Sequence, residues 1–137
     1  VFAEGECLRK TFDPDFMLYH TMAVDEWGHM KGADSAEYAN AVAAVGHLIA
    51  ARMPEWLEKG YQVVVTADHG MNNLGIHVGT EHAQREVALY IFSDKVENGR
   101  FEENYISQLN VAPLVCKLMG VPATEGMKQE LEIVFSK

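Results

Sequence analysis

Basic residues and long apolar runs are scarce in this sequence, and each scarcity excludes a class of protein. Lys and Arg number 11 against 20 Asp and Glu, which gives a formal net charge of -9. A chain this acidic does not attract the phosphate backbone of nucleic acid broadly, so we expect no nucleic-acid-binding surface. No apolar run approaches the roughly 20 residues that a membrane helix needs, so we expect no membrane segment.

Cysteine and targeting signals are scarce as well. The sequence has 2 cysteines, Cys7 and Cys116, which are far apart and lack the spacing of metal-binding pairs. We therefore expect two buried thiols rather than a disulfide or a metal site. No targeting segment is present in these residues, which leaves the compartment open and slightly favours the cytoplasm. The polar stretch before Pro14 predicts neither a strand nor a helix, and its abrupt start suggests a piece of a larger domain.

The apolar pattern predicts one α/β domain over residues 1–137. Val63, Val64 and Val65 form a β-branched run without alternation, which indicates a strand covered on both faces, as in parallel sheets. We expect this strand over residues 61–66, with further strands over 16–22 and 87–92. A helix ending at Gly120 is expected over residues 107–119.

A second helix is predicted between the first two strands, where Asp34 or Ser35 would cap its start. Apolar residues recur along one face at steps of three and four, a spacing that packs a helix on a sheet. They are Tyr38, Val42, Val45, Ile49 and Met53. Strand, helix and strand form the βαβ unit of a parallel sheet.

Five Asp and His side chains follow two of the predicted strands. One pair lies in an expected loop over residues 23–35, and the others follow the strand at 61–66. They are Asp25, His29, Asp68, His69 and His77. The carboxyl ends of parallel strands meet at one edge of a sheet, so we expect these groups to converge there. Carboxylate oxygen and imidazole nitrogen suit zinc and, with more oxygen ligands, manganese or iron.

Each of these residues also has an ordinary structural interpretation. A single Asp or His in a loop commonly caps a helix, forms a turn or faces solvent. Two pairs in matching places are harder to explain in that way. We expect His20 and His47 to be packed or partly exposed, and His82, which lies in a polar run, to face solvent.

Four short motifs follow one another within residues 16–120. The first is Asp25-Glu-Trp-Gly-His29, followed by Gly32, Ser35 and Tyr38. The others are Thr66-Ala-Asp-His-Gly-Met71, His77-Val-Gly-Thr80 and Arg85-Glu-Val-Ala-Leu-Tyr-Ile91. In this order they resemble the type I phosphodiesterase and nucleotide pyrophosphatase branch of the alkaline phosphatase superfamily. Its patterns are D-x-x-G-H with G, S and Y, then T-S-D-H-G-M, H-G-G-T and R-x-V-P-L-x-I. The departures at Ala67, Val78 and Ala88 remove no candidate ligand.

The resemblance implies a fold that these residues contain only in part. It is the alkaline-phosphatase-like three-layer α/β/α sandwich with a mostly parallel sheet. The 137 residues would form the carboxyl-terminal portion of a larger metal-dependent hydrolase domain. An unpaired sheet edge left by missing strands would favour a homo-oligomer.

The implied function is phosphodiester hydrolysis, of the nucleotide pyrophosphatase type, with two divalent metal ions and a small-molecule phosphoester substrate. Zinc is expected, with manganese or iron as alternatives. By the resemblance, Asp25, His29 and His77 hold the first ion, and Asp68 and His69 hold the second. The second ion also takes an earlier aspartate and a threonine or serine nucleophile. Neither has a match here, so we expect the nucleophile upstream and this chain alone to be inactive.

Several alternatives stay open at this point. His77 is preferred over His82 as the third ligand of the first ion because the Val78-Gly79-Thr80 that follows it resembles the turn of the family. A phosphomonoester or phosphonate hydrolase of the same superfamily is a sibling interpretation. A catalytically silent metal-binding domain and a plain α/β interaction domain are the two non-enzymatic ones.

Overall fold

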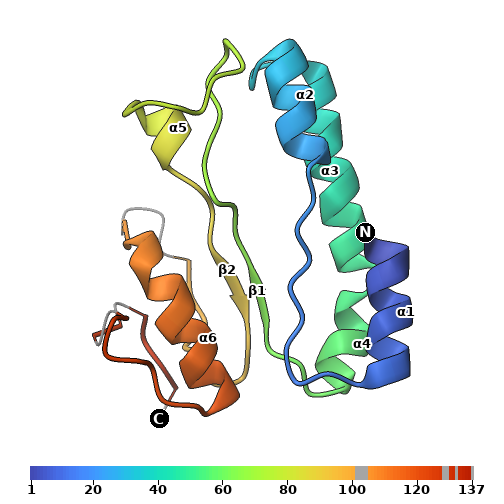
Figure 1. The fold of residues 1–137 in the computed structure, drawn as a ribbon, viewed down its shortest axis with the longest axis vertical. Helices are drawn as coiled ribbons and strands as arrows, with labels where there is room; N and C mark the ends of the chain where they lie inside the picture. The colour runs from blue at the N-terminus through green and yellow to red at the C-terminus, as the bar shows by residue number, and fades with distance from the viewer. Residues whose placement is uncertain (101–104, 128–129, 132, 137) are drawn as a thin grey trace.

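The structure is a computed structural model that describes residues 1–100, 105–127, 130–131 and 133–136. Helices lie along one side of the molecule, a pair of strands runs through the middle, and α5 and α6 lie on the other side (Figure 1). The helical side consists of α1 (Phe2–Phe12), α2 (Ala23–Lys31), α3 (Ala36–Ala50) and α4 (Met53–Glu58). The remaining elements are β1 (Val63–Val65), α5 (His82–Arg85), β2 (Tyr90–Phe92), the 3-10 helix η1 (Gln108–Asn110) and α6 (Val111–Met119).

The sheet differs from the prediction. In the described residues β1 and β2 form an antiparallel pair in which Val64 faces Ile91. The prediction of a mostly parallel sheet is therefore wrong for these strands, and the three-layer sandwich is not confirmed. An apolar run favours a covered strand, as in parallel sheets, but it does not fix the direction of the neighbouring strand. Residues 16–22, expected as a strand, are assigned to no strand.

Helices form at several places where none was expected, and the two longest are α1 and α2. Residues 2–12 form α1, and residues 23–31, expected as a loop, form α2. Gly28 favoured the loop interpretation because glycine weakens a helix. Its reason is packing: a Cβ atom at Gly28 would lie 2.8 Å from the Cε atom of Met71. The Met71 side chain therefore packs directly against α2 at Gly28.

The expected helix starts and stops fit the local sequence. The Ser35 hydroxyl accepts a hydrogen bond from the Tyr38 backbone N–H at 3.1 Å and caps α3. At the end of α6, Gly120 adopts the left-handed conformation, as predicted. The expected packing of α3 on the sheet is not seen in the described contacts, because α3 packs against α2 and α4. Ala41 is buried, whereas Val42, on the expected apolar face, is 47% exposed.

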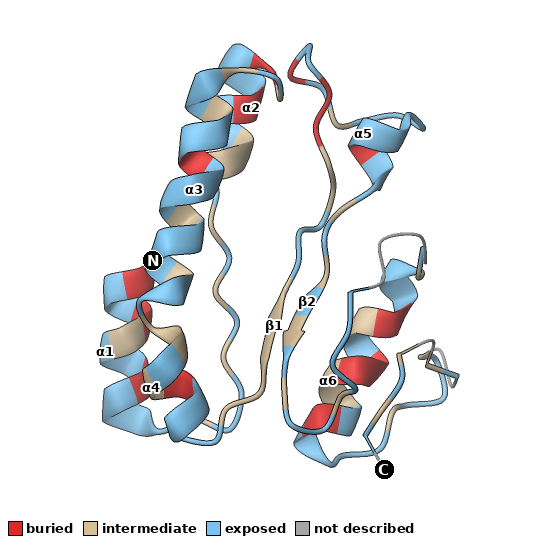
Figure 2. Cartoon of the chain, turned by 180° about the vertical axis from the view of Figure 1, so that it is seen from behind, coloured by how far each residue is buried: buried red, intermediate tan, exposed pale blue. Residues whose placement is uncertain are grey.

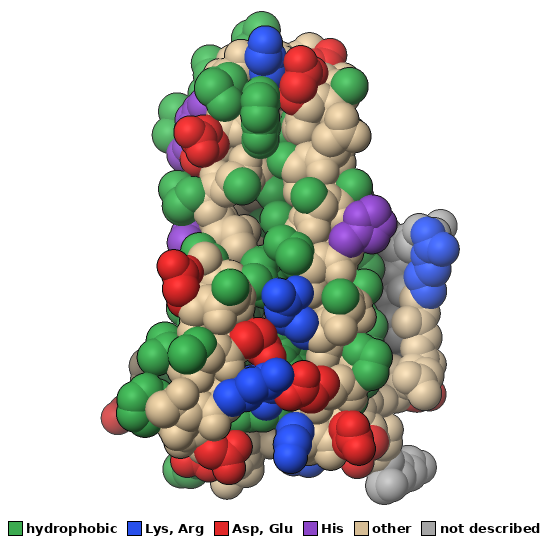
Figure 3. Space-filling view, turned by 90° about the vertical axis from the view of Figure 1, so that its right-hand side faces the viewer, with side chains coloured by type: hydrophobic (Ala, Val, Ile, Leu, Met, Phe, Trp, Pro, Cys, Tyr) green, Lys and Arg blue, Asp and Glu red, His purple; other side chains and the backbone are tan. Residues whose placement is uncertain are grey.

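The buried side chains are few and spread over several elements (Figure 2). The buried hydrophobic ones among the described residues are Phe2, Ala41, Trp56, Met71, Leu114 and Leu118. On the helical side, hydrophobic side chains reach the surface above a mixed group of acidic and basic ones (Figure 3). Cys7 is exposed and Cys116 is partly buried, and both are free thiols, so the prediction of a buried thiol is wrong for Cys7. None of the described helices is long and apolar enough to cross a membrane.

A carboxylate anchors α1 to α4 and to the extended segment before α2. Glu6 accepts hydrogen bonds from Arg9 at 2.9 Å, from the Tyr19 hydroxyl at 2.9 Å and from the Trp56 indole at 2.8 Å. Arg9 is buried and also pairs with Glu55. The hydrogen bond from Arg9 has the largest effect on the pKa of Glu6, which is lowered to about 2 although burial opposes the shift.

Candidate metal centre

Helix α2 presents the first two candidate ligands. Asp25 and His29 are four residues apart, which places them one above the other on the same face of a helix. The Nε2 atom of His29 lies 3.5 Å from the Oδ2 atom of Asp25. The expectation of a loop at this position was wrong, but the helix brings the two groups together by its own geometry.

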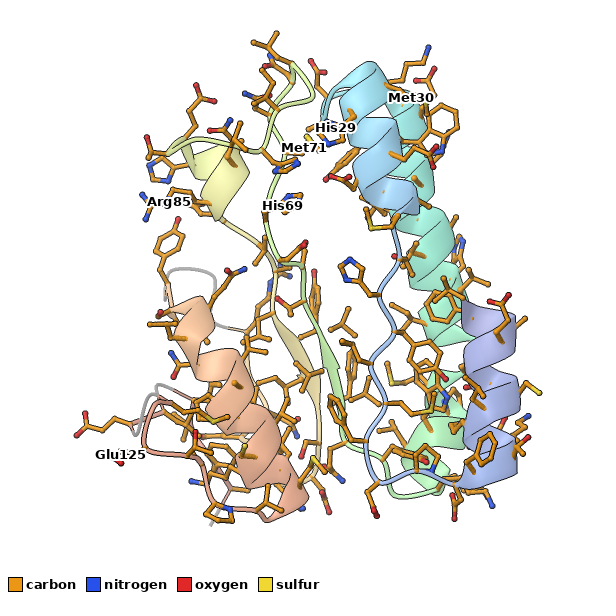
Figure 4. All side chains as sticks on the ribbon, in the orientation of Figure 1. His29, Met30, His69, Met71, Arg85 and Glu125 are labelled. Atoms are coloured by element: carbon orange, nitrogen blue, oxygen red, sulfur yellow. The ribbon has the colours of Figure 1, made fainter. Side chains whose placement is uncertain are left out.

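The other candidates follow β1. The Nε2 atom of His69 lies 3.9 Å from Asp25 Oδ1 and 3.7 Å from Asp68 Oδ1. The Nε2 atom of His77 also lies 3.9 Å from Asp25 Oδ1. Figure 4 shows His29 on α2 and His69 after β1 turned toward each other, with Met30 and Arg85 pointing away. All five predicted residues therefore gather at one end of the molecule, around Asp25.

The three imidazole rings are packed against one another. The rings of His69 and His77 are stacked with centroids 3.8 Å apart, and those of His29 and His77 are 5.0 Å apart. All three Nε2 atoms lie within 3.9 Å of a carboxylate oxygen of Asp25, so the rings line one small site.

Backbone carbonyls orient two of the rings. The Nδ1 atom of His29 lies 2.7 Å from the carbonyl oxygen of Gly75, and that of His69 lies 3.0 Å from the carbonyl oxygen of Gly70. A carbonyl oxygen only accepts, so each Nδ1 must carry the proton. The Nε2 atoms of His29 and His69 then face the carboxylate of Asp25. Metal-binding histidines are commonly oriented in this way.

The carboxylate of Asp25 is the unusual group in this cluster. Its Oδ1 atom is buried and has no hydrogen-bond partner among the described residues. The three nitrogen-to-oxygen separations of 3.5 to 3.9 Å exceed the roughly 2.7–3.2 Å of a hydrogen bond. Two ligands about 2.0–2.1 Å from a tetrahedral zinc ion would lie about 3.3 Å apart. The observed spacing is closer to that value, so the residues present fit a metal ion.

The structure mixes the two ligand sets that the resemblance implies. Asp25, His69 and His77 form a group whose ligand atoms all lie within 4.8 Å of one another. His29 adjoins this group through Asp25, and Asp68, whose side chain is 66% exposed, adjoins it through His69. In contrast, the side chain of His82 is 91% exposed on α5 and pairs with Glu86.

Some residues near the site were not singled out by the sequence. Gln108 donates from Nε2 to the carbonyl oxygens of Ala67 at 3.0 Å and Asp68 at 3.1 Å. Asn72, in the loop between His69 and His77, and Gln84, on α5, are buried polar residues near the histidines. The position of Asn72 between the two histidine motifs was the one available signal. Gln108 is 40 residues from Asp68, so its hydrogen bond to the Asp68 carbonyl could be found only from the fold.

Comparison with known proteins decides the family. The model of the type I phosphodiesterase / nucleotide pyrophosphatase family matches residues 3–113. The chain belongs to this family. Type I phosphodiesterases are part of the alkaline phosphatase superfamily, so the resemblance inferred from the four motifs is confirmed. The family handles phosphoesters and has an alkaline-phosphatase-like α/β fold.

Relatives of this chain include enzymes with different names. It is 29% identical over 115 residues to the human GPI ethanolamine phosphate transferase 3, catalytic subunit, covering 82% of this chain and 10% of that protein. It is 24% identical to the GPI ethanolamine phosphate transferase 2 of Schizosaccharomyces pombe, covering 82% of this chain and 17% of that protein. A 2,3-bisphosphoglycerate-independent phosphoglycerate mutase of Wolinella succinogenes is 31% identical, covering 85% and 23%. The chain thus spans a small part of these relatives, and no solved structure matches it significantly.

Proposed function

We propose that this chain supplies the metal ligands of a phosphoester-cleaving enzyme that uses two divalent metal ions and acts on phosphodiesters. The observation that carries the proposal is the buried Oδ1 atom of Asp25, which has no hydrogen-bond donor among the described residues and faces imidazole nitrogens. A buried carboxylate oxygen without a partner is costly unless a cation approaches it.

The residues divide by what each can do. Asp25, His69 and His77 would hold one ion, and His29 and Asp68 would complete the sites on either side. Zinc is the first choice for this set of oxygen and nitrogen donors, with manganese or iron as alternatives. Bound ions would supply positive charge to a phosphoryl group and to its nucleophile. The carbonyls of Gly75 and Gly70 hold His29 and His69 in the tautomer that binds metal.

Hydrolysis is the leading reaction, and transfer to an alcohol is the second candidate. The names of the relatives from human and Schizosaccharomyces pombe, both ethanolamine phosphate transferases, favour transfer. Both reactions require the same binding of a phosphoryl group. They differ in whether water or a hydroxyl compound accepts that group. A phosphomonoester or phosphonate hydrolase and a silent metal-binding domain are the remaining alternatives.

Two finer points belong to the same proposal. In the complete protein β1 and β2 would join a larger sheet of the α/β/α sandwich, a layout supported by helices on both sides of the strands (Figure 1). The nucleophile would come from outside these 137 residues. The chain alone should then bind metal yet turn over bis(4-nitrophenyl) phosphate more slowly than about 1 per second, the low end of ordinary enzyme rates.

Metal titration followed by an assay tests the proposal. Zn²⁺ or Mn²⁺ is titrated into the metal-free protein by calorimetry, and we expect two equivalents to bind, more weakly at acid pH because protons compete for the imidazoles. In the complete protein, assayed with bis(4-nitrophenyl) phosphate, added ethanolamine then separates the two reactions, since a transferase forms a new phosphodiester and a hydrolase does not. Failure of either ion to bind in the wild-type protein would remove the proposed function.

A further inference from the structure

The loop of residues 70–77 connects two candidate ligands, His69 and His77, and is built around a buried asparagine. Asn72 is 8% exposed, although asparagine is usually found at the surface. A buried amide is tolerated when its donors and acceptors are satisfied. The partners of Asn72 therefore show what the residue does.

The side chain of Asn72 closes the loop onto itself. Its Oδ1 atom accepts hydrogen bonds from the backbone N–H groups of Leu74 at 3.1 Å and Ile76 at 2.9 Å. The backbone N–H of Asn72 donates to the carbonyl of Ile76 at 3.1 Å. Both polar backbone groups of Ile76, the residue before His77, are thus bound by Asn72. The Gln84 amide adds a second donor to the Ile76 carbonyl at 3.2 Å.

The backbone of Asn72 also fixes the loop to the segment that follows α2. Its carbonyl accepts from the Ala33 N–H and from the Gly75 N–H, each at 3.1 Å. Gly75 has a positive φ of 73°, and a Cβ atom there would lie 2.7 Å from the carbonyl oxygen of Gly28. In this position the Gly75 carbonyl accepts a hydrogen bond from Nδ1 of His29. The turn shaped by Asn72 therefore reaches a ligand on another element.

We propose that Asn72 is a positioning residue for the candidate metal centre. It holds His77 and, through Gly75, the ring of His29 in the orientation that binds metal. The inference rests on the proposed function in naming a metal as the ligand. The coupling of Asn72 to His29 rests on the hydrogen bonds of the loop. Asn72 itself contacts no candidate ligand side chain in the described hydrogen bonds.

Three substitutions separate positioning from general stability. N72A leaves the Leu74 and Ile76 N–H groups without their acceptor. N72D keeps an oxygen that accepts from both, although it loses the donor to Glu81 and places a negative charge beside it. N73A changes the neighbouring exposed asparagine and serves as the matched control.

Two measurements are made on each metal-free protein. Titration with Co²⁺ gives the dissociation constant and visible absorption bands that report coordination geometry. We expect N72A to weaken binding about 10-fold or more and to shift the bands, as damage to the partners of metal ligands does. N72D should stay closer to wild type, and N73A should match it.

Nitrogen NMR of the histidine rings provides a readout that needs no metal. In the wild-type protein we expect His29 to be the Nδ1–H tautomer, and in N72A a mixture of tautomers, with N72D retaining the wild-type state. Wild-type affinity and an unchanged His29 tautomer in folded N72A would overturn the inference. If N72A does not fold, N72D tests the inference instead. A loss of Co²⁺ affinity in N72D as large as that of a ligand substitution would show that the hydrogen bonds from the Leu74 and Ile76 N–H groups do not position the ligands. Absence of Co²⁺ binding in wild type would remove the proposed function, while the tautomer still tests the positioning.

Discussion

Two ends of this molecule are each organised around one carboxylate, and the two carboxylates are treated in opposite ways. Glu6 lies among Arg9, Tyr19 and Trp56, all of which donate hydrogen bonds to it. Asp25 lies among imidazoles, and its buried Oδ1 atom receives no hydrogen bond from the described residues. A carboxylate that accepts hydrogen bonds from several donors stabilises a fold. A buried carboxylate oxygen that has no donor and faces imidazole nitrogens suits a cation.

The pKa of Glu6 agrees with this difference. It is lowered to about 2, chiefly by the hydrogen bond from Arg9, so the folded state favours the charged form of Glu6. Burial, followed by the hydrogen bond to Glu6, raises the pKa of Tyr19 to about 12. This end of the molecule is a closed network. Substitutions at the two carboxylates should therefore affect different properties: metal affinity at Asp25 and the free energy of unfolding at Glu6.

The largest effect is expected for D25N. The amide keeps the shape of the side chain but removes the charge that faces His69 and His77, so Zn²⁺ affinity should fall about 100-fold or more, beyond the 10-fold to 100-fold seen for outer partners of ligands. The free energy of unfolding of the metal-free protein should stay the same or rise, because a buried oxygen without a partner is costly. Calorimetric titration and urea unfolding measure the two quantities. A large loss of stability with intact Zn²⁺ affinity would place Asp25 in the same class as Glu6.

E6Q should show the reverse pattern. The substitution removes the charged acceptor of the buried Arg9, which should lower the free energy of unfolding by about 1–3 kcal/mol. Zn²⁺ affinity should be unchanged, since Glu6 makes no contact with α2 or the 70–77 loop in the described hydrogen bonds. Urea unfolding at neutral pH measures the first effect. A matched fall in metal affinity of the folded variant would show that the two ends are coupled.

A smaller effect is expected for single histidines. H77A should lower Zn²⁺ affinity about 10-fold or more, whereas H82A should change it little. The reason is that His77 faces Asp25, while the His82 side chain is 91% exposed and pairs with Glu86. Titration of both variants side by side provides the measurement, with H82A as the control for loss of an imidazole. The opposite ranking would transfer the third ligand to His82.

The smallest effect concerns acid stability. The pKa of Glu6 is lowered from 4.5 to about 2, so its contribution to stability is full above about pH 4.5 and is lost as the pH falls toward 2. The difference in free energy of unfolding between wild type and E6Q should therefore shrink over this range. Urea unfolding of both proteins at several pH values measures it, and the subtraction cancels other acidic groups. A difference that stays constant from neutral pH to pH 2 would contradict the assignment.

Local sequence determined several features of this protein by itself. Ser35 caps α3 because a hydroxyl at that position satisfies a free N–H group of the first turn, and Gly120 ends α6 because glycine adopts the left-handed conformation readily. The four ordered motifs were sufficient to identify the family, since each motif is carried by adjacent residues. These features depend on near neighbours in the chain, which is why sequence could predict them.

Tertiary structure decided the rest. Helix α2 was missed because Gly28 disfavours a helix locally, and the contacts of this segment with α3 and with Met71 are known only from the fold. The antiparallel direction of β2 and the absence of a strand at residues 16–22 were equally beyond an apolar pattern that reports burial alone. The sequence named five candidate ligands, but the contact of His69 with Asp25 and the role of Asn72 required the fold. Hydrogen bonds and ion sites join groups that are distant along the chain, and their geometry exists only after the chain has packed.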